Sequence, residues 1–135
     1  MAVTGSCLCG AVRYEITGSP GRTGHCHCSI CRKSHGAAFV TWAMVDPGQF
    51  RWTSGAELVA AYESSPQRAR CFCSRCGSAL VSTLCGNVME VALGTVDGDP
   101  GVRVIVPGDR QPEQAPEDLL EQAVAKDPST GFYQR

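Results

Sequence analysis

Apolar and polar residues alternate along several short stretches of this chain, and the alternation predicts β-strands. Between residues 11 and 17, Val12, Tyr14 and Ile16 alternate with Arg13 and Glu15, which is typical of a half-buried strand. Further strands are predicted over residues 39–45, 50–53, 57–62, 69–73, 78–82, 88–96 and 102–106. Segments rich in Gly, Pro, Ser or Asp separate them at residues 18–21, 46–48, 64–66 and 97–101. The pattern therefore predicts a mainly β fold.

Helical periodicity is limited to two places. Residues 29–34 favour a single helical turn, and residues 117–126 favour a short amphipathic helix that begins after Pro116 and ends before Pro128. The apolar face of that helix would carry Leu119, Leu120, Ala123 and Val124. We therefore expect one domain over residues 1–108, with a linker and a short helix over residues 109–135 packed on it.

Composition narrows the functional classes. The 135 residues include 12 Lys and Arg against 13 Asp and Glu, a formal charge of −1, whereas a general nucleic-acid binder carries a basic excess. No apolar run approaches the roughly 18–20 residues that span a bilayer, and the N-terminus lacks the pattern of a signal peptide. These features predict a cytoplasmic protein without a membrane or nucleic-acid partner. A monomer and a homodimer formed through a strand edge are both compatible with the pattern.

The 9 cysteines carry most of the functional information. In a reducing compartment, clustered cysteines indicate metal ligands or catalysts rather than disulfides. Cys7 and Cys9 form a C-x-C motif, residues 26–31 form C-x-C-x-x-C, and residues 73–77 form C-x-x-C-G. Residues two apart on an extended chain point to the same side, and C-x-x-C-G is typical of a tight turn that supplies half of a tetrahedral zinc site. The sequence therefore predicts zinc.

Counting ligands favours two zinc ions per chain. A closed structural site has four ligands, which the two shorter motifs supply together as Cys7, Cys9, Cys73 and Cys76. The remaining triad, Cys26, Cys28 and Cys31, is one ligand short. An alternative remains open, because Cys71 gives residues 71–76 the same C-x-C-x-x-C spacing as the triad. Eight sulfurs would then form two closed sites.

The missing fourth ligand of the triad decides its chemistry. His25, His27, His35, Cys71 or Cys85 could close the site and make it structural, whereas water or substrate would leave it reactive. Zinc with three thiolates has a formal charge of about −1, so it is a weaker Lewis acid than zinc on three histidines and suits a soft thiolate ligand. An open triad therefore indicates sulfur chemistry rather than hydrolysis.

Several ordered motifs resemble one family. They are residues 5–14 (GSCLCGAVRY), 26–33 (CHCSICRK), 36–39 (GAAF), 72–78 (FCSRCGS) and 93–97 (LGTVD). Over residues 4–98 the chain resembles the glutathione-dependent formaldehyde-activating enzymes, which are related to the zinc-binding part of centromere protein V. After Asp97 it departs from them, because residues 102–107 lack the family's His-containing strand and its Lys-Ala-Pro-Trp-like segment.

The resemblance implies a zinc-stabilised β-tent fold and a carbon–sulfur lyase activity. It implies a structural zinc on Cys7, Cys9, Cys73 and Cys76, and a reactive zinc on Cys26, Cys28 and Cys31. The position of Cys71 is not usually a ligand in the family. The implied reaction joins glutathione and formaldehyde to S-(hydroxymethyl)glutathione, or runs in reverse. The basic, proline-rich extension of the centromere relative is absent, so its partners are not expected.

The enzymatic hypothesis assigns further roles near the triad. A substrate thiol would attack formaldehyde, and His27 or His35 would protonate the alkoxide. Arg32 and Lys33 would bind a substrate carboxylate. The alternatives are a non-catalytic zinc module, whose triad would be closed by a protein ligand, and a zinc-ribbon adaptor. Seven thiolates and two zinc ions would lower the formal charge to about −4, which disfavours nucleic acid further.

Overall fold

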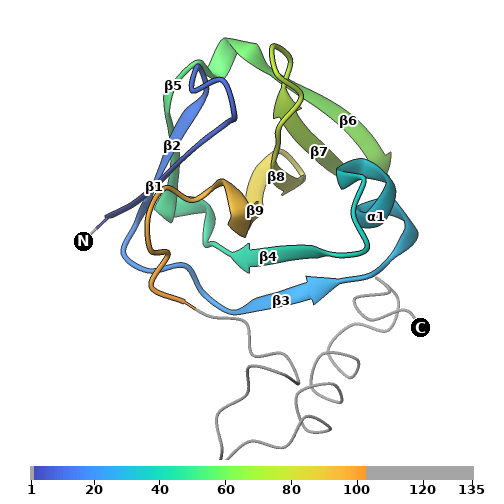
Figure 1. The fold of residues 1–135 in the computed structure, drawn as a ribbon, viewed down its shortest axis with the longest axis horizontal. Helices are drawn as coiled ribbons and strands as arrows, with labels where there is room; N and C mark the ends of the chain where they lie inside the picture. The colour runs from blue at the N-terminus through green and yellow to red at the C-terminus, as the bar shows by residue number, and fades with distance from the viewer. Residues whose placement is uncertain (1, 103–135) are drawn as a thin grey trace, which may run out of the picture.

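The computed structural model describes residues 2–102, which form two antiparallel β-sheets (Figure 1). The smaller sheet has the order β1-β2-β5, with β1 at Ala2–Ser6, β2 at Arg13–Thr17 and β5 at Phe50–Ser54. Buried Tyr14 and Ile16 alternate with more exposed neighbours along β2, as the sequence pattern predicted. This face of the small sheet packs onto the second sheet.

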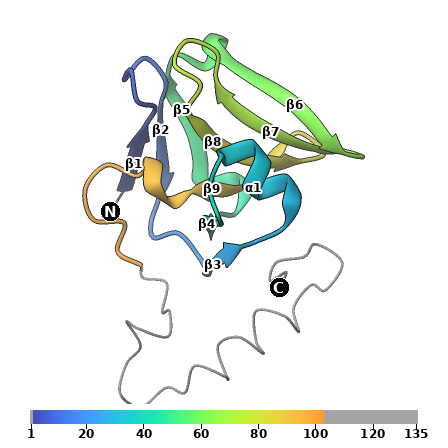
Figure 2. The same ribbon diagram turned by 45° about the vertical axis from the view of Figure 1, so that its right-hand side comes forward.

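The larger sheet has six strands in the order β3-β4-β9-β8-β7-β6. Their bounds are Thr23–Cys26 (β3), Val40–Met44 (β4), Val59–Ser65 (β6), Arg68–Cys73 (β7), Ala79–Leu84 (β8) and Asn87–Ala92 (β9). One α-helix, α1 at Ser29–His35, joins β3 to β4 (Figure 2). Short 3-10 turns lie at Pro47–Gln49, Ala56–Leu58 and Leu93–Thr95. The fold is therefore mainly β, as predicted.

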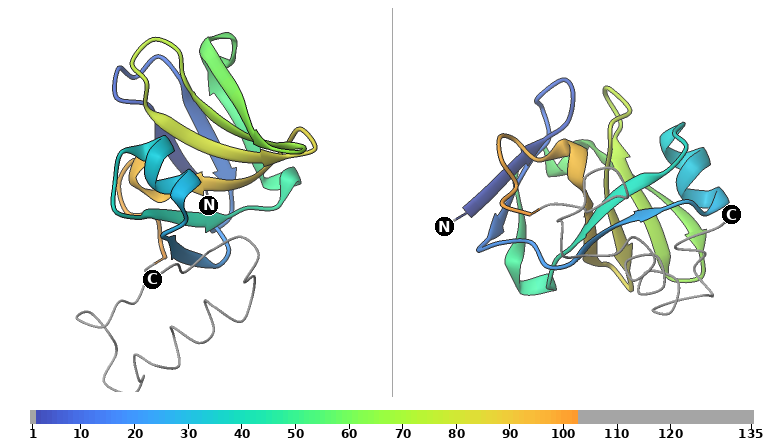
Figure 3. Two further views of the ribbon diagram at one scale, coloured as in Figure 1. Left: turned by 90° about the vertical axis from the view of Figure 1, so that its right-hand side faces the viewer. Right: turned by 60° about the horizontal axis from the view of Figure 1, so that its bottom comes forward.

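The core consists of two separate hydrophobic clusters, of which the larger joins the two sheets. The larger includes Tyr14 and Ile16 of the small sheet and Leu80, Val81 and Val91 of the large one, all at most 1% exposed. Cys7 and Cys73 belong to this cluster. The smaller cluster contains Val40, Trp42 and Ala92 with the cysteines of the triad. Figure 3 shows α1 at the opposite end of the molecule from β1 and β2, so the two cysteine groups lie in different parts of the fold.

The structure differs from the expected elements at a few positions. β1 and β3 were not predicted, and β3 has no apolar alternation because its sequence is Thr-Gly-His-Cys. Residues 93–95 form a 3-10 turn rather than the end of a strand, and Ser64 and Ser65 extend β6 rather than forming a loop. Most of the strand predicted over residues 102–106, and the whole helix predicted over residues 117–126, lie outside the described residues.

Among residues 2–102, no helix has both the length and the apolar character that crossing a lipid bilayer requires.

Candidate metal centres

Four cysteines from two distant segments meet beside the larger hydrophobic cluster. The sulfurs of Cys7, Cys9, Cys73 and Cys76 lie within 4.8 Å of one another. Each segment is a tight turn closed by a glycine with positive φ: Gly10 N–H donates to Cys7 O at 3.0 Å, and Gly77 N–H donates to Cys73 O at 2.8 Å. Leu8 N–H donates to Ser78 Oγ at 2.8 Å and links the two turns.

The geometry of this group fits a tetrahedral metal ion. Zinc–sulfur bonds of about 2.3 Å in a tetrahedron place the sulfurs about 3.8 Å apart. Cys7 Sγ lies 3.5 Å from Cys9 Sγ, which lies 3.9 Å from Cys73 Sγ. Val12 N–H donates to Cys7 Sγ at 3.3 Å, and Arg75 N–H donates to Cys73 Sγ at 3.4 Å. Such amide donors stabilise thiolates, so the residues present suit a soft divalent cation.

Charge is unevenly distributed among these four thiols. Hydrogen bonds with the side chain and the backbone of Ser78 lower the pKa of Cys76 to about 5. A hydrogen bond from the backbone of Ala11 lowers the pKa of Cys9. Hydrogen bonds with Cys7 and the neighbouring cysteines, together with burial, outweigh this effect and raise that pKa to about 11. Four thiols that compete for protons in this way gain most from a cation that allows all of them to ionise.

The triad forms the second group. The sulfurs of Cys26, Cys28 and Cys31 lie within 4.8 Å of one another, and all three residues are buried. Cys28 is the N-cap of α1, and its Sγ accepts a hydrogen bond from Cys31 N–H at 3.4 Å. The helix start thus positions two of the three sulfurs. No histidine, cysteine or carboxylate elsewhere in residues 2–102 joins this group.

Cys31 differs from the other two cysteines because two side chains donate to its sulfur. Trp42 Nε1–H and Arg70 Nη1–H each lie 3.4 Å from Cys31 Sγ. The hydrogen bond from Cys26, together with Trp42 and Arg70 and against the effect of burial, lowers the pKa of Cys31 to about 5. The same hydrogen bond from Cys26 to Cys31, together with burial, raises the pKa of Cys26.

The three histidines that the sequence placed near the triad all pack against aromatic side chains. His27 and His25 both lie against Phe39, with ring centroids 5.3 and 4.4 Å away, and His25 Nδ1 lies 2.9 Å from Thr41 Oγ1. His35 packs edge-on against Trp42 at 5.2 Å. Burial lowers the pKa of His35, while the negative charge of Cys31 opposes that shift.

Arg70, which the sequence analysis did not single out, is a cationic side chain in contact with the triad, while the binding of a substrate carboxylate by Arg32 and Lys33 stays a prediction. Arg32 and Lys33 are exposed on α1, whereas Arg70 lies on β7 and contacts Cys31. Sequence reasoning missed Arg70 because it is 39 residues from Cys31 along the chain. The sequence around Arg70 predicted a strand, but it did not show where that strand lies in the sheet. Only the sheet order gives that position.

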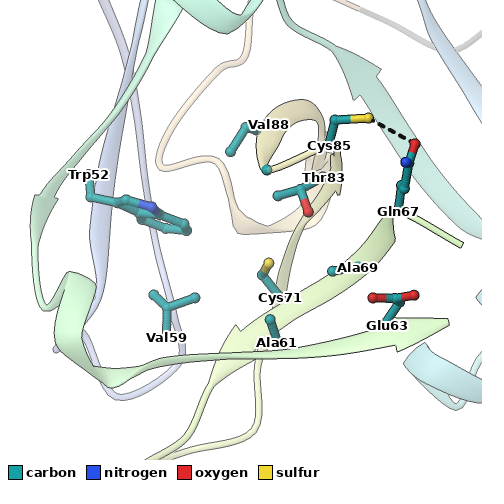
Figure 4. Close-up of a pocket in the computed structure, with 11 residues that line it drawn as sticks. Trp52, Val59, Ala61, Glu63, Gln67, Ala69, Cys71, Thr83, Cys85 and Val88 are labelled. Atoms are coloured by element: carbon teal, nitrogen blue, oxygen red, sulfur yellow. Dashed lines mark hydrogen bonds between the residues drawn. The ribbon is translucent and has the colours of Figure 1, made fainter.

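Cys71 and Cys85 belong to neither group. Both line a cavity of about 530 Å³ together with Trp52, Gln67, Thr83 and Val88, and Figure 4 shows the Cys71 side chain pointing into it. Cys71 follows Arg70 on β7, so the two side chains lie on opposite faces of the sheet. Cys85 is exposed, and its Sγ donates to Gln67 Oε1 at 3.2 Å. This placement keeps Cys71 away from the triad that Arg70 contacts.

We expect Cys85 to be the one cysteine that reacts rapidly in the metal-loaded protein. Cys9 and Cys85 are the exposed cysteines among the 9, and a bound metal would protect Cys9. Brief treatment with iodoacetamide followed by intact-mass measurement should add one label, which Cys85→Ser removes. A chelator should expose the remaining thiols. Rapid labelling of Cys9 in the loaded protein would contradict its role as a ligand.

The structure thus defines the class of this protein as mainly β, with a four-cysteine group and a separate three-cysteine group that could each hold a metal ion. Residues 2–108 match the family described as "Glutathione-dependent formaldehyde-activating enzyme", and the chain belongs to this family. This confirms the resemblance inferred from the motifs.

Two similar proteins show how far the likeness extends. A curated protein of Halomonas elongata named "Putative glutathione-dependent formaldehyde-activating enzyme" is 38% identical over 87 residues, which cover 59% of this chain and 55% of that protein. The chain thus aligns with about half the length of this curated relative. The crystal structure of a Rhodobacter sphaeroides protein matches with a TM-score of 0.60 and 27% identity, covering 71% of this chain and 89% of the other.

Proposed function

We propose that the protein joins a glutathione-type thiol to formaldehyde, and catalyses the reverse cleavage, at Cys26, Cys28 and Cys31. We further propose two zinc ions per chain, a structural one on Cys7, Cys9, Cys73 and Cys76 and a reactive one on the triad. In this proposal residues 1–108 form the zinc-binding domain; the linker and helix predicted over residues 109–135 lie outside the described residues.

The observation that carries the proposal is the asymmetry between the two groups. The first has four sulfurs, enough for a closed tetrahedral site, while the triad has three, with no fourth side-chain ligand from residues 2–102. A site that lacks a fourth protein ligand can accept one from a substrate. Soft thiolate surroundings favour a sulfur ligand, and the family match supports glutathione as the source.

The chain's own residues have defined tasks in this chemistry. When bound at the triad, zinc would supply a Lewis acid that lowers the pKa of an incoming thiol. Trp42 and Arg70 donate to Cys31 and hold it as a thiolate. The substrate sulfur gives up its proton and forms a bond to the formaldehyde carbon, while the carbonyl oxygen becomes a hydroxyl. His35, packed on Trp42, and His27, packed on Phe39, are the candidate proton donors.

A metal count combined with a thiol titration tests this proposal. Protein purified without chelator should contain two zinc ions per chain, and X-ray absorption should show an added sulfur neighbour at one of them when glutathione is added. Exchange between free ¹³C-formaldehyde and S-(hydroxymethyl)glutathione, followed by NMR, should accelerate with the protein. One zinc, or two with unchanged coordination, would favour a non-catalytic zinc module instead.

A further inference from the structure

Arg70 is held in place on three sides beside the triad. Its Nε donates to Ser64 Oγ at 3.1 Å, its Nη1 donates to Cys31 Sγ at 3.4 Å, and its guanidinium carbon lies 5.8 Å from the centre of the Trp42 ring. Ser64 lies on β6, next to β7 in the sheet, and Trp42 lies on β4. A guanidinium fixed in this way is a permanent positive charge at a defined position.

The neighbouring arginine cannot play the same part. Arg68 is paired with the half-buried carboxylate of Glu90 at 3.3 Å and also donates to Ser82 at 2.8 Å. Arg70 forms no salt bridge with a carboxylate within residues 2–102. Burial raises the pKa of Glu90, and the charges of Arg68 and, more weakly, Arg70 oppose that shift, so Glu90 also faces Arg70 without forming an ion pair with it. Of the two arginines on this face of β7, Arg70 is the one whose hydrogen bonds go to Cys31 and Ser64 rather than to a carboxylate.

Binding of an anionic thiol would increase the negative charge of the metal-loaded triad, and the positive charge of Arg70 can offset that increase. Three thiolates leave a divalent cation with a formal charge of about −1, and a fourth, anionic thiolate would raise the negative charge to about −2. In a buried site, where like charges are screened poorly, that addition is unfavourable without a counter-charge. Cys26, Cys28 and Cys31 are only 5%, 7% and 2% exposed, so water contributes little to that screening.

We propose that Arg70 is a positioning residue that offsets the negative charge of the triad through Cys31 and so allows an anionic thiol to bind there. This inference rests on the proposed thiol-binding role of the triad. The ligand class is a thiolate, and Arg70 acts on the charge of its sulfur rather than on a carboxylate elsewhere in the substrate. The same contact draws electron density from Cys31 alone, which makes the three sulfurs inequivalent donors.

Two thiols of different charge separate these roles. The protein is loaded with Co²⁺, whose sulfur-to-metal charge-transfer bands report thiol binding, and is titrated with glutathione, which carries carboxylates, and with 2-mercaptoethanol, which carries none. We expect Arg70→Met to weaken the binding of both thiols at least tenfold, and Arg70→Lys to recover most of that loss because it keeps the charge. Arg51→Met, which removes the exposed arginine paired with Glu15, is the matched control and should bind both thiols like the wild type.

The outcomes are distinct. A loss confined to glutathione would show that Arg70 recognises a carboxylate, and equal binding by Arg70→Met and the wild type would show that it plays no part; either result overturns the inference. No band shift in the wild type would overturn both this inference and the proposed function. Thiol binding that depends on Arg70, without formaldehyde exchange, would sustain the inference and overturn only the proposed reaction.

A second variant guards against misfolding. Ser64→Ala removes the hydroxyl that anchors Arg70 Nε and leaves the charge in place, so we expect a smaller loss, about threefold, for both thiols. The Co²⁺ bands of the four-cysteine group serve as an internal measure of the fold in every variant. If Ser64→Ala and Arg70→Met both retain those bands and both bind thiols normally, the assignment is wrong.

Discussion

Replacing Cys73 with serine should unfold the protein. Cys73 is 0% exposed, lies in the main hydrophobic cluster, and joins β7 to the loop between β1 and β2, 64 residues away from Cys9. Structural zinc contributes about 10–16 kcal/mol of binding free energy. A domain of this size is stable by only about 5–15 kcal/mol in total. We therefore expect Cys73→Ser, or prolonged treatment with a strong chelator, to abolish the cooperative thermal transition measured by circular dichroism.

The matched control for this prediction is Cys85→Ser. Cys85 is exposed, lies outside both cysteine groups and contacts Gln67 through one thiol hydrogen bond. We expect its melting temperature to stay within a few degrees of the wild type, because surface substitutions usually change stability by less than about 0.5 kcal/mol. A cooperative transition of Cys73→Ser near the wild-type temperature would show that the four-cysteine group does not hold the fold together.

Local patterns predicted the strands that have one buried face. β2, with Tyr14 and Ile16 buried between polar neighbours, and β4, with buried Val40 and Trp42, both have clear apolar positions at a spacing of two. β3 has no such signal, since the buried residue at its end is Cys26 and its other positions are polar or glycine. Its structure depends on pairing with β4, where His25 is opposite Thr41, and that pairing is a property of the fold rather than of the segment.

In the candidate site, too, contacts between distant strands could not be predicted from the local sequence. The spacing of the cysteines alone predicted two groups, and the structure brings the sulfurs of each together. Spacing could not place Arg70, because the contact with Cys31 requires β7 and the β3–α1–β4 segment to share one sheet through β9 and β8. Each cysteine motif is short and visible in the sequence, whereas Arg70 comes from a distant strand with no motif around it. The basic residues that are close to the triad in the sequence, Arg32 and Lys33, were predicted to bind a substrate carboxylate, which is a different role.

On the proposed function, Cys28→Ser should abolish formaldehyde exchange while leaving the fold intact. Cys28 is the N-cap of α1, where its side chain accepts from Cys31 N–H, and serine is among the best residues for that position. The substitution thus preserves the helix start and removes one thiolate. Mutating residues around a metal site typically costs about 10–100-fold, so losing a ligand should reduce formaldehyde exchange by more than about 100-fold. The NMR exchange assay measures this loss.

The contrast between the two serine variants tests whether the four-cysteine group stabilises the fold while the triad carries the proposed reaction. Cys28→Ser should melt cooperatively and contain one zinc per chain rather than two, whereas Cys73→Ser should not melt cooperatively at all. The reason is topological: the triad joins α1 to the short segment that precedes it, while the four-cysteine group joins segments 64 residues apart and so removes far more chain entropy. Wild-type exchange by Cys28→Ser with a single zinc would place the chemistry outside the triad.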